Sequence, residues 1–126
     1  PLKPINSYTQ NYRLGTLTIN ISIYRYPHAM IAADAANMLI EHLLKLSDDD
    51  LAEINLAAPA PAGARAVLGI FDEGAFEKIG VFALLAQGEY AVEILCSDFS
   101  GNFVSATSNV DALLGAASEK LKGYGI

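Results

Sequence analysis

The sequence predicts a single α+β domain of two layers, in which a mainly antiparallel sheet packs against helices across residues 1–126. Aliphatic and polar residues alternate from Thr16 to Tyr24, as in a strand with one dry and one wet face, which is typical of antiparallel sheets. Glu89–Cys96 alternates in the same way. Between them, Ala29–Leu46 is rich in the good helix formers Ala, Leu and Met.

The N-terminal residues 1–13 contain two prolines and show no periodicity, so we expect an extended arm. Its apolar and aromatic residues would pack on a neighbour: Leu2, Ile5, Tyr8 and Tyr12. The first strand follows, and its aliphatic side carries Leu17, Ile19, Ile21 and Ile23.

The first helix follows Pro27, a residue that favours helix starts. Its polar residues recur at intervals of three or four and form one narrow stripe: Asp34, Asn37, Glu41 and Lys45. The rest of the circumference is apolar, including Met38. This pattern predicts a helix buried on most sides, between the sheet and another subunit.

The middle of the chain combines helix-like and strand-like patterns. Ser47 and the three aspartates Asp48–Asp50 suit the first turn of a short second helix. The apolar run Ala66–Phe71 predicts a strand buried on both faces. Ala75–Gln87 fits either a helix or a strand, and we favour the helix. A crossover helix there would make the fold α/β instead.

The C-terminal part predicts a turn at residues 98–102, a hairpin strand at Phe103–Thr107 and a last helix at Asn109–Lys122. Ser108 is suited to cap that helix. We expect both long helices to cover one face of the sheet, which gives the two layers.

Composition excludes several classes of function. A net charge of −6 gives no basic surface for nucleic acid. No apolar run reaches the length of about 18–20 residues that a membrane helix needs, and no signal peptide is recognisable. One cysteine cannot form an internal disulfide. We therefore expect a cytoplasmic protein without nucleic-acid or membrane partners.

No catalytic constellation is recognisable, and we expect neither a cofactor nor a metal. Cys96 ends the dry side of a strand among acidic neighbours, which favours an inert core thiol. The two histidines, His28 and His42, lack the spacing of metal ligands. Asp48–Asp50 lacks the spaced oxygen ligands of a calcium loop.

The balance of 52% apolar against 17% charged residues indicates more apolar surface than one small domain can hide. We therefore predict a non-enzymatic, self-associating interaction module, a homodimer or higher assembly. The alternative is a small-molecule-binding protein or small enzyme with a pocket between sheet and helices. Its residues would converge after the first strand and at the following helix start: Tyr24, Tyr26, His28 and Asp34.

Overall fold

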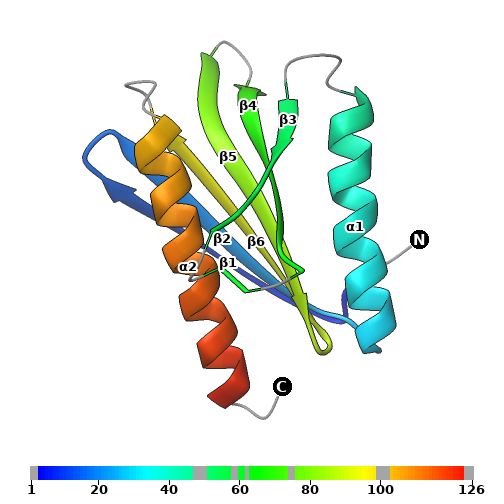
Figure 1. Ribbon diagram of the computed structural model, residues 1–126. Coiled ribbons are helices and arrows are strands. Elements are labelled where there is room, and N and C mark those ends of the chain that lie inside the picture. Colours follow the sequence, from blue (N-terminus) through cyan, green and yellow to red (C-terminus); the bar gives the residue numbers. More distant parts are fainter. Residues whose placement is uncertain are drawn as a thin grey trace.

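The structure, a computed structural model, describes residues 3–46, 51–57, 60–61, 63–73, 76–98 and 103–123. Six strands form one antiparallel sheet in the order β1-β2-β6-β5-β4-β3, with two long helices (Figure 1). The predicted α+β class is therefore confirmed. The elements are β1 (Asn6–Leu14), β2 (Leu17–Arg25), α1 (Ala29–Leu46), β3 (Leu51–Ile54), β4 (Arg65–Glu73), β5 (Phe76–Gln87), β6 (Tyr90–Asp98) and α2 (Phe103–Gly123).

The expected N-terminal arm is an edge strand from Asn6 onward. β1 pairs with β2 in register, from Asn6 opposite Arg25 to Leu14 opposite Leu17. Gly15 has a φ of 64° in the two-residue turn between them, a conformation that glycine adopts without strain. Described side chains on both sides of β1 are exposed, which explains why its sequence has no hydrophobic period.

The segment predicted as a short second helix contains strand β3 instead. Leu51 lies opposite Gly69 of β4, and Ile54 lies opposite Ala66. Pairing with β4 thus overrides the local helix signal. The predicted capping residues 47–50 lie outside the described residues, as does most of the predicted turn, at 99–102.

β5 corrects our preference for a helix at residues 75–87. It is a strand of twelve residues, paired with β4 on one side and β6 on the other. Its backbone runs so close to β6 that a Cβ on Gly80 would lie 2.4 Å from the carbonyl oxygen of Cys96. Only glycine fits there without a shift in the backbone.

The segment predicted as a hairpin strand, Phe103–Thr107, is the first part of α2. β6 already pairs with β2 and β5, so it has no free edge for another strand. The bounds of α1, by contrast, are those the sequence predicts, and β2 differs from its prediction by one residue at each end.

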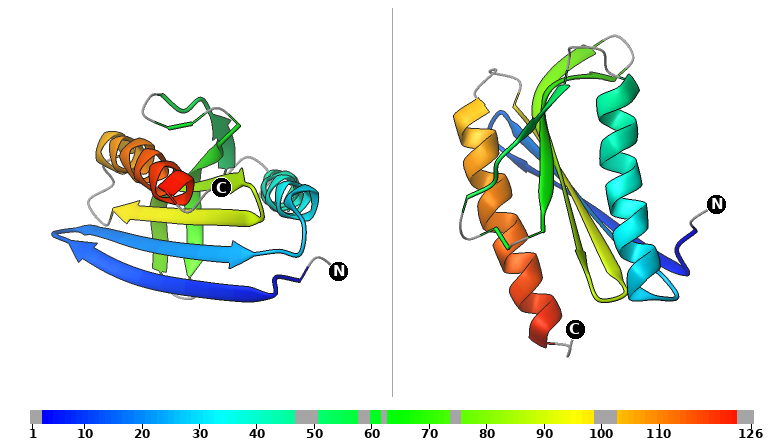
Figure 2. Two further views of the ribbon diagram at one scale, coloured as in Figure 1. Left: turned by 90° about the horizontal axis from the view of Figure 1, so that it is seen from below. Right: turned by 45° about the vertical axis from the view of Figure 1, so that its right-hand side comes forward.

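The two helices pack on opposite faces of β5, although we expected both on one face. Ala83 and Leu85 share a buried cluster with Leu114 of α2. Leu84, between them, packs with Ile40 of α1. Neighbouring strand residues point to opposite faces, so the sheet lies between the helices in this region (Figure 2).

Candidate functional site

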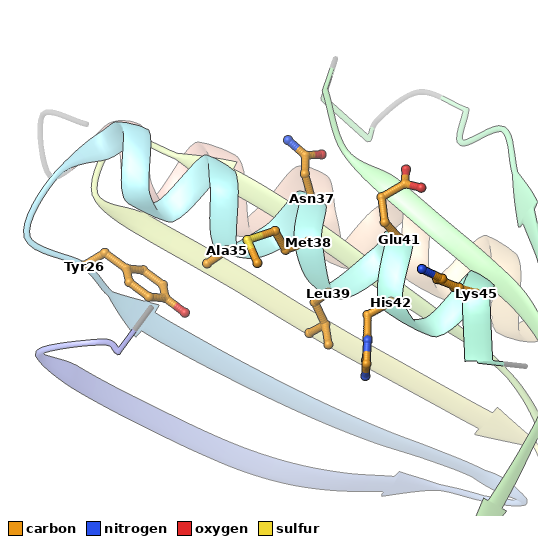
Figure 3. Close-up of a pocket in the computed structure, with 8 residues that line it drawn as sticks. All are labelled: Tyr26, Ala35, Asn37, Met38, Leu39, Glu41, His42 and Lys45. Atoms are coloured by element: carbon orange, nitrogen blue, oxygen red, sulfur yellow. The ribbon is translucent and has the colours of Figure 1, made fainter. Parts of the chain in front are cut away.

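A groove runs along α1 beside the sheet (Figure 3). We call it the α1 groove; its volume is about 630 Å³. Leu39 and His42 project from α1 toward the side of β1 and β2, whereas Asn37 and Glu41 project away from it. The lining residues are Tyr26, Ala35, Asn37, Met38, Leu39, Glu41, His42 and Lys45.

Tyr26 forms one end of the α1 groove. Its backbone N–H donates to the carbonyl oxygen of Glu89 at 2.8 Å, which continues the pairing of β2 with β6 by one residue. The side chain is 7% exposed and packs with Ala32 of α1 and Ala91 of β6. Burial, with smaller effects of Glu93 and Tyr24, raises the pKa of Tyr26, so its hydroxyl stays protonated at neutral pH.

A polar cluster lies on neighbouring strands, outside the lining of the groove. Ser22 of β2 lies opposite Glu93 of β6, and Tyr24 is two residues further along the same face. Burial raises the pKa of Tyr24; the hydroxyl of Ser22 opposes this effect and the carboxylate of Glu93 adds to it. Burial raises the pKa of Glu93, although the bond from Tyr24 partly opposes that effect.

Two of the four predicted ligand residues come together and two do not. Tyr24 and Tyr26 belong to one packed cluster. His28 serves the start of α1, where its carbonyl oxygen accepts the N–H groups of Ile31 and Ala32, and its side chain is exposed. Asp34 is exposed on α1 and does not line the groove.

The sequence prediction missed Glu93. Pairing the two strands with alternating patterns would have brought their polar faces together. Glu93 and Ser22 both lie on those faces. Met38, predicted among the buried residues of the first helix, is 62% exposed in the groove.

The outer edge of β1 is a second candidate site, which we call the β1 edge. Every described side chain of this strand, from Asn6 to Arg13, is exposed. Tyr26 bonds to β6, whereas Arg25 faces β1: its carbonyl oxygen accepts the N–H of Ile5 at 2.8 Å, and Asn6 lies opposite it in the register. Outward-directed N–H and C=O groups then belong to Ser7, Thr9, Asn11 and Arg13.

Aromatic side chains stand beside the β1 edge. Tyr8 is 60% exposed and Tyr12 47% exposed. They line a groove of about 420 Å³ between β1, β2 and α2, together with Ile21, Ile23 and Leu113. Tyr8 and Tyr12, which the sequence predicts to pack on a neighbour, are therefore exposed for such a contact.

The structure also shows the surroundings of the Cys96 thiol and the distribution of side chains that could bind a metal. Cys96 is free and fully buried, and burial raises its pKa to about 12, so it is not a thiolate at neutral pH. Within residues 3–46, 51–57, 60–61, 63–73, 76–98 and 103–123, no three His, Cys, Asp or Glu side chains are grouped to hold a metal.

Comparison with known proteins shows the fold alone. No family model matches the chain, and no curated protein matches it. Its structure is similar to the crystal structure of the extracellular domain of PknH from Mycobacterium tuberculosis, with a TM-score of 0.57 and 10% sequence identity. The match covers 89% of this chain and 61% of that chain. Neither helix, over its described residues, is long and apolar enough to span a membrane.

Proposed function

We propose that this protein is a non-enzymatic interaction module that self-associates by pairing the β1 edges of two copies. The observation that carries the proposal is an exposed edge strand of nine residues with no proline and no acidic residue. Long exposed edges of this kind are templates for pairing with another strand, and most monomeric proteins shorten or block them.

A second copy is the occupant that this strand fits best. Antiparallel pairing about a two-fold axis at Gln10 uses all nine residues, Asn6–Leu14, of both strands. It places Tyr8 opposite Tyr12 of the second copy, twice per dimer. Such aromatic cross-strand pairs add about 0.2–1 kcal/mol each.

The charge on the strand is compatible with this symmetry. Arg13 is the one charged residue of β1, in a protein of net charge −6. With the axis at Gln10, Arg13 lies opposite Ser7 of the second copy, so no like charges face each other. The symmetric edge therefore avoids the repulsion that two acidic molecules meet elsewhere.

Size-exclusion chromatography with light scattering tests the proposal at about 100 μM protein. The wild type is expected at about 27 kDa, twice the chain mass of 13.4 kDa. Asn11→Pro removes an outward N–H without breaking a bond to β2, so it should give a folded monomer. Asn11→Thr, which keeps that N–H, should remain a dimer.

Circular dichroism is the control, and it should show that both variants are folded. A wild-type protein of 13.4 kDa at this concentration, or a folded Asn11→Pro variant that remains dimeric, contradicts the proposal.

A further inference from the structure

We propose that the groove between α2 and the strands β1 and β2 binds an amphiphilic anion, with a carboxylate head beside Lys120 and an alkyl tail along the groove floor. We call it the α2 groove; its volume of about 420 Å³ is typical of small-molecule sites. The inference does not rest on self-association, because strand pairing uses backbone groups of β1, whereas side chains line the groove.

Two walls of the α2 groove come from regular elements. Leu113, Ala117 and Lys120 recur at intervals of three or four residues, which places them on one face of α2. Every second residue of β1 from Tyr8 to Tyr12 lines the opposite wall, because alternate residues of a strand share a face. A helix and a strand, rather than loops, therefore fix the shape of the groove.

The floor of the α2 groove is a part of the core that stays partly open. Four partly buried side chains pack there against the main core cluster: Ile21, Ile23, Leu113 and Ala117. An alkyl chain lying on them would remove apolar surface from water, which is favourable. The floor therefore suits the hydrocarbon tail of a ligand.

The charge of the α2 groove favours an anionic head. Among the described lining residues Lys120 alone is charged, and none is an aspartate or glutamate. Over the described residues no carboxylate pairs with Lys120, whereas the nearby Lys122 binds Glu119 at 3.2 Å. Lys120 is exposed, so an anion can reach it without breaking an ion pair.

Gln10, on the opposite wall from Lys120, supplies a hydrogen-bond donor. The hydroxyl of Tyr8 donates to the side-chain oxygen of Gln10. This bond leaves the amide N–H groups of Gln10 to donate to a ligand. Hydrogen bonds to a charged acceptor are stronger than those to a neutral one, so the two walls together favour a carboxylate over an alcohol.

An NMR titration with octanoate, below its micellar concentration, tests the inference; octanol and octylammonium are matched neutral and cationic probes. We expect shifts of the amide signals of Ile21, Leu113 and Lys120, and binding of octanoate about tenfold tighter than that of either other probe. Lys120→Gln should weaken binding of octanoate about tenfold. Lys122→Gln changes the net charge equally but lies outside the groove lining, so it should have no effect.

A second pair of variants tests the place of the tail. Ala116 is exposed and lines the groove, so Ala116→Trp should fill the groove and abolish binding. Ala112→Trp puts the same ring at an exposed position of α2 outside the lining, and it should bind octanoate as the wild type does. Circular dichroism should show that both variants are folded. Asn11→Pro should keep the wild-type affinity, so the result for the ligand is separate from that for self-association.

Equal binding of octanoate and octylammonium overturns the inference, and so does undiminished binding of octanoate by Lys120→Gln or by folded Ala116→Trp. Absence of chemical-shift changes at the groove residues overturns it as well. Cosedimentation of the protein with phosphatidylglycerol vesicles, without binding of free octanoate, would assign the groove to a lipid surface and also contradict the proposed ligand.

Discussion

The two edges of the sheet differ in how they end. β3 has four residues and lies beside Arg65 of β4, whose guanidinium binds Glu53 of β3 through two bonds of 2.8 Å. The same guanidinium reaches Glu41 of α1 at 2.7 Å. β1 has nine residues, and among the described residues no comparable ion-pair network holds it to a helix.

The β3 edge is therefore protected from pairing with other chains, whereas the β1 edge is not. A short strand tied to a charged cluster is a common defence against pairing with other chains. The β1 edge is a long strand beside the exposed side chains of Tyr8 and Tyr12. We therefore expect the β3 side to contribute more to stability, and we propose association at the β1 side; the changes below separate the two.

The largest effect on stability is expected from a substitution in the core between α1 and the sheet. Ile40 is fully buried against Val67 and Leu84. Ile40→Ala should lower the free energy of unfolding by about 2–5 kcal/mol, because it removes buried methylene groups and leaves a cavity. Urea unfolding measures this. Met38→Ala on the same helix should change it by less than about 0.5 kcal/mol, and equal losses in the two variants would contradict the packing of α1.

Breaking the network at the protected edge should have a smaller effect. Arg65→Met keeps an unbranched apolar stem and removes the bonds of the guanidinium to Glu53 and Glu41. Because these carboxylates are well exposed, we expect a loss of about 1 kcal/mol in unfolding free energy. Hydrogen exchange of the β3 amides should become faster, whereas Arg13→Met on β1 should leave it unchanged. Unchanged exchange in Arg65→Met would show that the network does not hold this edge.

The pH dependence of stability should report the same network, with the smallest effect. The hydrogen bonds and charge of Arg65 lower the pKa of Glu53. A carboxyl whose pKa falls on folding stabilises the protein above its unfolded pKa, about 4.3, and this contribution is lost as pH falls through the folded value. Urea midpoints at pH 7 and pH 3 should therefore differ less in Arg65→Met than in wild type. An equal difference would assign the pH dependence to other groups.

Sequence patterns predicted the elements in which one face is buried and the other is exposed. β2 and α1 were predicted closely because each carries a clear period of apolar residues, as in Ile19 and Ile21. β5 was missed because Leu84 and Leu85 are buried on opposite faces, which removes the alternation. β1 was missed for the opposite reason, since described side chains on both of its faces are exposed.

The candidate sites were predicted in part. Tyr24 and Tyr26 are two residues apart, and this spacing predicted that they lie together; they do, although Tyr26 is buried rather than exposed. Glu93 reaches them through a strand pairing that joins distant segments, which no local pattern specifies. The same limit applies to the opposite placement of the helices, which depends on the order of strands in the sheet.

A cysteine cross-link tests the pairing of two β1 edges most directly. With the two-fold axis at Gln10, this residue faces its own copy in a non-hydrogen-bonded pair, with a Cα separation of about 4.5 Å, which a disulfide can bridge. Arg13→Cys is the control, because its two copies would lie about 20 Å apart along the strands. Cys96 is buried and does not compete. Under mild oxidation, Gln10→Cys should give a covalent dimer on non-reducing gels and Arg13→Cys should not; equal cross-linking of both variants, or of neither, would contradict the pairing.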